Sequence, residues 1–399
     1  MRTFRQALLA SLALLAVGCT PVPPAATALP PAAPAEQTAA ATPVILLSID
    51  GFRADYLDRG LTPNLQQLAK TGAHAPYMRP GFPSVTFPNH YSVVTGKAPG
   101  EHGIINNTIE DPEIPGVTFR LSNAEAVTDR RWWDDAEPIW VTAEKRGIRT
   151  ATMFWPGSEA AIRGVRPTDF TKFDRHKTST ERIDQVLAWL DRPEAERPRL
   201  ITLYLQETDD IGHAKGTEGP EIDAAIRNSD AAVGRLLEGL RARNLAANLV
   251  VVSDHGMVNV NRVIRLDKIA SPQDFRLVTG GAVAGIEARE GREAALAASL
   301  LKPHDGMECW KKGTLPARFV YNDHRRIPSF ICLATPGGMI TDREPQSLPA
   351  GMHGYDPDLP EMAAIFVANG PDIPAGTDTG PMRVEQVQPY LLKLLGLTR

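Results

Sequence analysis

The chain has 399 residues, of which 43% are hydrophobic and 23% are charged, and its formal net charge is −4. This is the composition of an ordinary soluble protein, long enough for one large domain or two with an ample core. The slightly acidic balance gives no argument for binding of nucleic acid through a basic surface, so we expect no stable nucleic-acid partner.

The first 42 residues have the layout of an export signal followed by a tether. Two arginines precede an apolar run at 7–17 that is too short to span a bilayer. Residues 16–19 resemble a bacterial lipobox, with alanine where leucine is usual; plain signal cleavage nearby is the alternative. We predict a signal peptide over 1–18 and, over 19–42, a lipid anchor on Cys19 with a Pro/Ala-rich tether. With this anchor the protein is expected to be periplasmic. The lipid would be its only attachment to a membrane, and the outer membrane is favoured.

Beyond residue 43, apolar strands alternate with amphipathic helices. Strands are predicted over 44–49, 73–78, 200–205, 249–252 and 363–368, and helices over 62–70, 179–190, 221–244 and 384–395. Continuous apolar runs are typical of strands buried on both faces of a parallel sheet. Polar clusters follow several of these strands. This pattern predicts an α/β fold with its site beyond the carboxyl ends of the strands.

The sequence pattern changes after residue 267. Residues 271–345 contain short strand candidates at 281–287, 318–321 and 331–334 and one helix at 290–301. We predict a smaller α+β lobe over 271–345, inserted in a main domain that spans 43–399. Cys309 and Cys332 lie in this lobe. In an oxidising compartment they could form a disulfide; two separate buried thiols are the alternative, because spacing does not show that they meet.

A proline-rich segment at 79–90 places Thr86 between Pro83 and Pro88. Proline fixes φ and disfavours helix for the residue before it, so the segment is expected to be rigid. Threonine is a weak nucleophile that needs a fixed position and a strong activator, and a metal ion is one such activator. Taken alone, the segment is also consistent with a rigid loop that carries an incidental threonine.

Aspartate and histidine residues gather where predicted strands end, and they form a set of possible metal ligands. The set is Asp50, Asp209, His213, Asp254, His255 and His353. Asp209 and His213 are four residues apart and therefore share one face of a helical turn. Imidazole and carboxylate are suitable zinc donors, and catalytic zinc keeps a position open for substrate or water. Each residue alone has a simple structural explanation, but their joint occurrence around a rigid threonine predicts a zinc pair.

These motifs resemble the nucleotide pyrophosphatase/phosphodiesterase (type I phosphodiesterase) family of the alkaline phosphatase superfamily. The matching segments, in the family's order, are 48–53, 82–90, 95–96, 101–107, 154–159, 209–213, 253–257, 353–356 and 362–371. The resemblance implies an alkaline-phosphatase-like fold, in which helices flank a central, mostly parallel sheet and a smaller lobe is inserted. It makes 43–399 a phosphodiesterase catalytic domain.

The resemblance also implies two zinc ions. One would be held by Asp209, His213 and His353, and the other by Asp50, Asp254, His255 and the Thr86 oxygen. Asp210 is a rival for Asp209, because it too lies within a turn of His213; the family pattern favours Asp209.

Three further positions match the family's substrate contacts. Asn107 corresponds to the asparagine that holds a phosphate oxygen, which gives it a catalytic and a substrate-binding role. Phe87 and Tyr204 correspond to the aromatic pair that sandwiches a nucleobase. Core packing is the alternative for both rings.

The implied reaction is zinc-dependent hydrolysis of nucleotide phosphodiester and pyrophosphate bonds, through a phosphothreonine on Thr86, with release of nucleoside 5′-monophosphates. A phosphomonoester carries an extra negative charge, and monoesterases of this superfamily tend to place extra cationic or metal groups around it. A diester is favoured here because the sequence shows no matching Lys/Arg pair beside the site. The aromatic pair also offers an apolar surface for the second substituent of a diester. Three alternatives stay open: a phosphodiesterase for choline headgroups of lysophospholipid or sphingomyelin, since aromatic rings also bind quaternary ammonium; a phosphomonoesterase; and an exported, inactive binding protein. The complete ligand set argues against the last.

Overall fold

The computed structural model describes residues 42–321 and 323–398. The predicted signal peptide, the Cys19 anchor and the tether up to residue 41 lie outside the described residues. Within the described ranges, no helix combines the length and the apolar character that crossing a bilayer requires.

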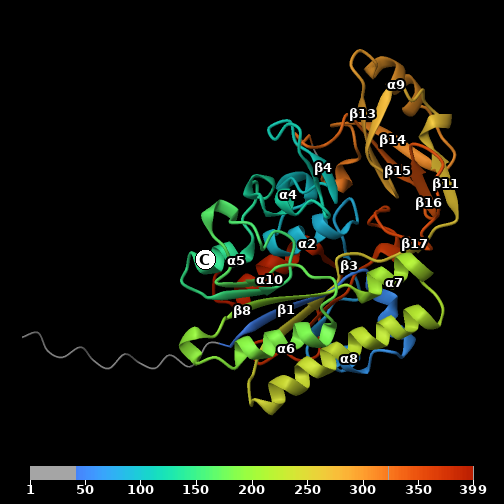
Figure 1. Cartoon of the computed structure of the whole chain (residues 1–399). Coiled ribbons are helices and arrows are strands. Elements are labelled where there is room, and N and C mark those ends of the chain that lie inside the picture. The colour runs from blue at the N-terminus through green and yellow to red at the C-terminus, as the bar shows by residue number, and fades with distance from the viewer. Residues whose placement is uncertain (1–41, 322, 399) are drawn as a thin grey trace, which may run out of the picture. The chain divides into compact units, whose positions relative to one another are not determined.

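An eight-stranded sheet forms the centre of the described chain, in the order β19-β2-β18-β9-β1-β8-β6-β7 (Figure 1). Its strands are β1 (Val44–Ile49), β2 (Ala73–His74), β6 (Thr150–Met153), β7 (Asp169–Thr171), β8 (Leu200–Leu205), β9 (Asn248–Val252), β18 (Phe366–Asn369) and β19 (Thr377–Asp378). The strands from β9 to β7 run parallel, whereas β18 pairs antiparallel with β9 and β2. β1 lies between β8 and β9 and is buried throughout, as its continuous apolar sequence predicts. The α/β class and the mostly parallel sheet are confirmed.

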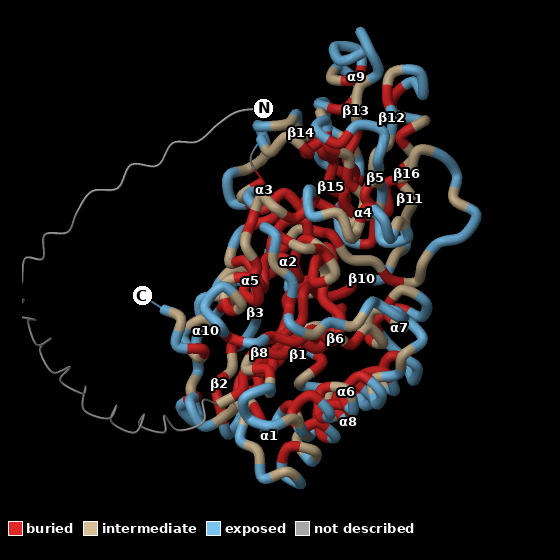
Figure 2. The backbone as a smooth tube through the Cα atoms, turned by 60° about the vertical axis from the view of Figure 1, so that its left-hand side comes forward, coloured by how far each residue is buried: buried red, intermediate tan, exposed pale blue. Residues whose placement is uncertain are grey.

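Helices cover both faces of this sheet, and the alternating side chains of β1 divide between them. Ile45 and Leu47 enter the core shared with α1 (Pro63–Thr71), α6 (Ser179–Leu190) and α8 (Pro220–Ala242). Val44 and Leu46 enter the core shared with α2 (Thr86–Thr95), α5 (Ile139–Glu144) and α10 (Val387–Leu394). Figure 2 shows the buried sheet between these layers, with the outward side of α8 exposed.

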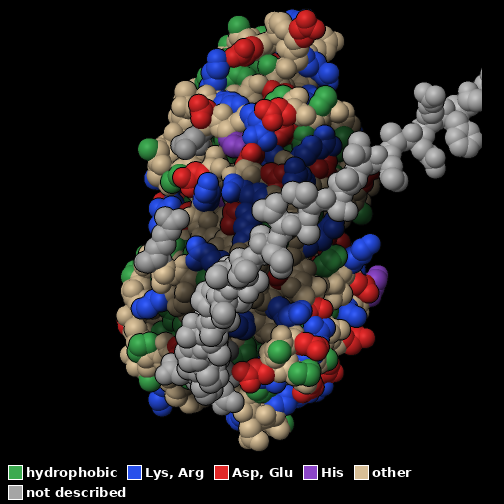
Figure 3. All heavy atoms as spheres, turned by 90° about the vertical axis from the view of Figure 1, so that its left-hand side faces the viewer, with side chains coloured by type: hydrophobic (Ala, Val, Ile, Leu, Met, Phe, Trp, Pro, Cys, Tyr) green, Lys and Arg blue, Asp and Glu red, His purple; other side chains and the backbone are tan. Residues whose placement is uncertain are grey.

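Shorter elements join these layers. They are β3 (Met78–Arg79), α3 (Pro99–His102), β4 (Thr108–Glu110), β5 (Thr118–Arg120), α4 (Ala124–Thr128), α7 (Glu207–Lys215), β10 (Val258–Asn259), β17 (Gly351–Met352) and β20 (Met382–Arg383). On the surface that Figure 3 presents, Lys and Arg side chains are interspersed with Asp and Glu, in keeping with the modest net charge.

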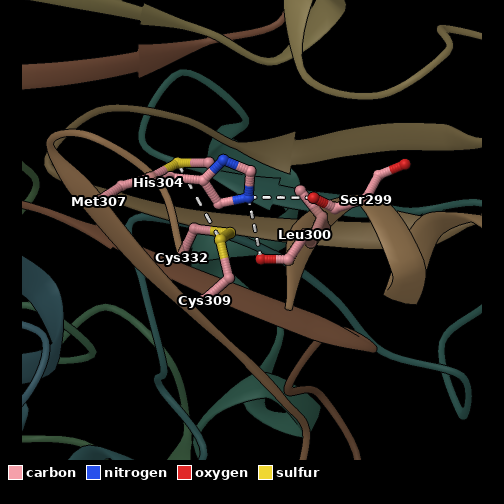
Figure 4. Close-up of a disulfide and its surroundings, with 6 residues drawn as sticks. All are labelled: Ser299, Leu300, His304, Met307, Cys309 and Cys332. Carbon is pink, nitrogen blue, oxygen red and sulfur yellow. Dashed lines mark hydrogen bonds between the residues drawn. A yellow bond between two sulfur atoms is a disulfide. The ribbon is translucent and has the colours of Figure 1, made fainter. Parts of the chain in front are cut away.

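A smaller antiparallel sheet follows, in the order β12-β13-β15-β14. The region predicted as a lobe, 271–345, contains β12 (Phe275–Thr279), β13 (Val283–Ala288), α9 (Glu293–Leu300), β14 (Met307–Lys311), β15 (Phe330–Ala334) and β16 (Gly338–Thr341); β11 (Arg262–Arg265) precedes it and pairs with β16. Cys309 and Cys332 lie directly opposite each other on β14 and β15, and their sulfur atoms are joined as a disulfide (Figure 4).

The predicted strand at 318–321 is wrong. After Pro316, residues Ala317–Phe319 form a 3₁₀ turn instead. The rings of Phe319 and Tyr321 pack against Phe82, with centroids 4.2 and 5.1 Å away. These two residues alternate as they would in a strand, but the rings are used for contact with the Thr86 segment rather than for sheet pairing.

The proline-rich segment is also more than a rigid loop, because helix α2 begins at Thr86 itself. Pro88 lies in the first turn of this helix, where its missing N–H removes no intrahelical hydrogen bond. Thr86 is therefore held by the start of a buried helix as well as by the prolines before it.

Removal of the disulfide should destabilise the lobe while leaving the distant sheet edge intact. The two cysteines are 23 positions apart, so the double variant Cys309→Ser/Cys332→Ser is expected to lose about 3 kcal/mol of lobe stability. Urea unfolding and limited proteolysis of the purified protein would measure this. Wild-type protein treated with a thiol reductant is the matched control, and unchanged protease resistance in both samples would contradict the expectation.

Candidate active site

The predicted ligands meet at one edge of the central sheet, beyond the carboxyl ends of β1, β8 and β9. Asp50 directly follows β1, and the pair Asp254 and His255 comes just after β9. Helix α7, which follows β8, carries Asp209 and His213, and β17 leads to His353. Adjacent parallel strands end at the same edge, which is why residues 50 and 254 come together across 204 positions of chain.

Two groups of three residues could each hold a metal ion. Within each group, the ligand atoms, one from each residue, all lie within 4.8 Å of one another. One group is Asp50, Asp254 and His255, and the other is Asp209, His255 and His353. His255 belongs to both groups, so they form one continuous cluster. His213 adjoins the second group, with Nε2 3.5 Å from Asp209 Oδ2. The structure thus brings all six predicted ligands together, and it gives His255 a more central place than the resemblance does.

Asp210, the rival for Asp209, lies apart from this cluster. Its Oδ2 accepts a hydrogen bond from Gln206 at 3.1 Å, and Oδ1 lies 3.7 Å from Arg175. The geometry therefore agrees with Asp209 as the ligand.

The three histidine rings are oriented by backbone carbonyls. Nδ1 of His213, His255 and His353 lies 2.8, 2.9 and 3.0 Å from the carbonyl oxygens of Gly351, Gly256 and Ser84, respectively. If Nδ1 donates to these carbonyls, Nε2 is left to face the cluster with its lone pair. Metal-binding histidines are held in this way, because the hydrogen bond fixes both the tautomer and the ring orientation.

Buried carboxylate oxygens that lack a well-aligned hydrogen bond show that a cation fits here. Asp50 Oδ1, Asp209 Oδ1 and Asp254 Oδ2 are buried and accept no well-aligned hydrogen bond from the described residues, although His255 Nε2 and His90 Nδ1 lie 3.0 and 3.3 Å from Asp254 Oδ2. Buried, unpartnered charge is costly unless an ion or a proton compensates it. These donors are those that divalent transition metals accept, so the cluster suits metal binding.

The pKa values within the cluster reflect the same crowding. Burial, together with the charges of Asp254 and Asp209, raises the pKa of Asp50 well above its usual range. Burial raises the pKa of Asp209 to about 7. Burial disfavours the charged form of His255, but the charge of Asp254 outweighs this and raises the pKa of His255 to about 10. Without metal, a proton on His255 thus offsets part of the negative charge.

Thr86 points into this cluster. Its side chain is almost buried, and Oγ1 lies 3.2 Å from His255 Nε2. Asn107 lies next to it, and its Oδ1 accepts a hydrogen bond from the Phe87 N–H at 2.9 Å. Because Oδ1 is occupied, the donor end of the Asn107 amide is the group left for a substrate oxygen.

The two predicted base-binding rings have different surroundings. Phe87 is partly buried, with its ring near those of Phe119 and Trp133. Tyr204 donates its hydroxyl to Asp50 Oδ2 at 2.6 Å, which ties it to the ligand cluster. The role of these rings in a base sandwich stays a prediction.

Phe173, a residue for which the sequence predicts no role, lies beside Tyr204. Its side chain is 55% exposed, and its ring lies 6.3 Å from that of Tyr204 and 5.2 Å from that of Phe154. It follows β7, a three-residue strand with the sequence Asp-Phe-Thr that is too short and too polar to predict. In the sequence, only the position of this aromatic residue, shortly after β7, could have indicated that it lies near the site.

The sequence profile described as Type I phosphodiesterase / nucleotide pyrophosphatase matches residues 44–356. The chain belongs to this family. An uncharacterized pyrophosphatase/phosphodiesterase of Schizosaccharomyces pombe is 38% identical to this phosphodiesterase over 344 residues, which cover 82% of the chain and 71% of the relative. A venom phosphodiesterase of Crotalus durissus collilineatus is 37% identical over 348 residues, which cover 83% of the chain but 41% of the snake protein.

Solved structures agree with this assignment. An inactive variant of murine ectonucleotide pyrophosphatase / phosphodiesterase 5, in complex with AMP, matches with a TM-score of 0.85 and 31% identity, over 90% of this chain and 96% of that one. The alkaline-phosphatase-like fold is thereby confirmed. The relatives of this chain are named pyrophosphatases and phosphodiesterases, so the chain is an enzyme of the nucleotide pyrophosphatase/phosphodiesterase class.

Proposed function

We propose that this phosphodiesterase hydrolyses nucleotide phosphodiester and pyrophosphate bonds with two zinc ions and a phosphothreonine on Thr86, and that it releases nucleoside 5′-monophosphates. The observation that supports this most directly is the place of Thr86 Oγ1, 3.2 Å from His255 Nε2 at the metal-ligand cluster. A hydroxyl at that place can be both a ligand and a nucleophile.

The ions would be held as the resemblance implies. Asp209, His213 and His353 would hold one ion, and Asp50, Asp254, His255 and Thr86 the other. When bound, the ions would neutralise the carboxylates and lower the pKa of the Thr86 hydroxyl.

Thr86 is the first residue of α2, where the helix N-terminus favours negative charge. After its proton is released to solvent, Thr86 Oγ1 forms a bond to phosphorus while the bond from phosphorus to the leaving oxygen breaks. Water then bonds to phosphorus, the Oγ1–phosphorus bond breaks, and Oγ1 regains a proton. In both steps the Asn107 amide would donate to a non-bridging phosphate oxygen, in a fixed geometry that needs no reorganisation.

Two relatives support a nucleotide substrate. The murine neighbour was solved with AMP, and a Xenopus laevis relative that is 34% identical over 370 residues, 91% of this chain, is named bis(5′-adenosyl)-triphosphatase. The chain spans 80% of that relative's length. Aromatic rings at Phe87 and Phe173 offer faces on which a base can stack.

The test is product analysis in ¹⁸O-labelled water with diadenosine triphosphate as substrate and zinc present. We expect AMP that carries the label on its phosphate, because water attacks the phosphorus retained in AMP. Release of choline phosphate from a lysophospholipid, with no AMP from the dinucleotide, would contradict the nucleotide assignment and favour the choline-headgroup alternative.

Phe173 and Tyr204 should affect the kinetics in different ways. Phe173→Ala is expected to raise KM for a nucleotide aryl diester roughly 10-fold by removing a stacking face, with little effect on a small aryl methyl phosphodiester. Tyr204→Phe, which deletes the hydroxyl on Asp50, is expected to lower kcat for both substrates alike. Steady-state kinetics on the two substrates separates the roles. Phe170→Ala, also exposed, is the control, and a base-dependent KM effect from Tyr204→Phe would overturn this division.

We further propose that the protein is exported and anchored through a lipid on Cys19. Three features of the sequence support this: the apolar run at 7–17, the lipobox-like residues 16–19, and a Pro/Ala-rich tether whose composition cannot form a hydrophobic core. Metabolic labelling with a fatty acid tests it, since Cys19→Ala should abolish the label and move the enzyme to the soluble periplasmic fraction; a labelled variant would contradict it.

A further inference from the structure

His90 is a buried histidine that the reaction outlined above does not use. It lies one helical turn after Thr86 on α2 and has no exposed surface. Its Nδ1 lies 2.9 Å from the carbonyl oxygen of Thr86 and 3.3 Å from Asp254 Oδ2. Its Nε2 lies 2.8 Å from Ser48 Oγ. One ring nitrogen thus spans the nucleophile's backbone and a metal-ligand carboxylate, while the other is held by β1.

The ring of His90 is also enclosed by aromatic neighbours. Trp155 donates its Nε1–H to the His90 carbonyl at 3.0 Å, and its ring lies 5.1 Å from the imidazole. The ring of Tyr204, whose hydroxyl binds Asp50, lies 5.2 Å away on edge. The imidazole therefore has little freedom to turn, and its two nitrogen contacts are fixed in space.

A second buried histidine shows what a merely structural one looks like here. His102 is equally buried, and its Nε2 lies 3.0 Å from Ser92 Oγ and 3.1 Å from the Pro88 carbonyl oxygen. None of its contacts within the described ranges reaches a ligand of the cluster. Both histidines pair with a serine, so burial and serine pairing do not account for the contact of His90 with Asp254.

We propose that His90 is a positioning residue that fixes Asp254 and Thr86 relative to each other, so that both can hold the same metal ion. Partners of this kind behind metal ligands orient the ligand, and their loss typically weakens metal binding 10–100-fold. Ser48 has a supporting role, because its hydroxyl sets the rotation of the ring. The proposal rests on the proposed function only in treating Asp254 and Thr86 as ligands of one ion.

The experiment uses two amide variants that each replace one ring nitrogen. In His90→Asn the amide nitrogen can take the place of Nδ1 as a donor, and in His90→Gln the side-chain amide can instead take the place of Nε2 beside Ser48. Zinc alone is the probe, titrated into the metal-free protein in competition with a chromophoric chelator. The melting temperature of each metal-free variant is measured in parallel, and His102→Asn and His102→Gln are the matched controls.

We expect zinc affinity within about 3-fold of wild type for His90→Asn and a loss of about 10–100-fold at one site for His90→Gln. Ser48→Ala should give a smaller loss, and the His102 variants should lower the melting temperature without changing zinc affinity. Equal zinc affinities in His90→Gln and wild type, equal losses in both amide variants, or a wild type that binds no zinc would each overturn the proposal. Because affinity is measured without substrate, failure of the nucleotide assignment leaves this comparison intact.

Discussion

Replacing Thr86 with alanine is expected to lower kcat roughly 10⁴-fold or more, because the variant has no oxygen to attack phosphorus. Zinc binding should remain within a few-fold of wild type, because the ligand cluster keeps its six carboxylate and imidazole donors. The measurement is kcat on a nucleotide aryl diester together with zinc content of the same sample. The murine neighbour is a threonine-to-alanine variant described as inactive, which is the behaviour we expect here.

Two variants on the same helix control this result. Thr86→Ser keeps a hydroxyl and should retain measurable turnover. Thr95→Ala removes a buried hydroxyl at the other end of α2, where Oγ1 donates to the Tyr91 carbonyl, and should leave kcat unchanged. Near-normal turnover in Thr86→Ala, with its zinc present, would show that another group attacks phosphorus.

The second large effect is expected at His255, because this residue belongs to both groups of ligand atoms. His255→Ala should remove the ion proposed to lie with Asp50 and Asp254 and weaken binding of the second proposed ion, and it should reduce kcat/KM roughly 10³-fold, since several kcal/mol of charge stabilisation are lost. His213 adjoins only the group that contains Asp209. His213→Ala should therefore weaken binding of one ion and leave binding of the other unchanged. Metal analysis after dialysis and steady-state kinetics measure both effects.

His304→Ala is the control for the loss of an imidazole. His304 lies in the lobe, where Nε2 is near the carbonyl oxygens of Ser299 and Leu300 (Figure 4), so zinc content and rate should stay at wild-type values. If His255→Ala leaves binding of the second ion unchanged, His255 does not contribute to both sites.

Much of the fold could be predicted because its signals are local. The runs that form β1 and β8 are mostly apolar, and their bounds match the sequence prediction residue for residue. The ligands could be found for the same reason, because Asp50 and Asp254 directly follow strands and the sheet carries both to one edge.

The missed features depend on packing between distant segments. The hydroxyl of Tyr204 binds Asp50 across 154 positions, and His90 lies beside Asp254 across a similar span, so neither contact has a sequence signature. Residues 318–321 alternate as a strand does, but the ring of Phe319 packs against Phe82 instead. The sharing of His255 between two groups of ligands likewise appears only when three strand ends are placed together.

The central claim is that this is a nucleotide phosphodiesterase whose rate depends on the Thr86 and zinc-ligand cluster. The most direct measurement is the ratio of kcat/KM for a nucleoside 5′-monophosphate aryl diester to that for the matching aryl monophosphate, with zinc present. We expect a large ratio in favour of the diester, since no Lys/Arg pair lies among the hydrogen-bond partners of Thr86 and Asn107 in the described residues. A ratio near or below one would contradict the account and would make the protein a monoesterase of the same superfamily.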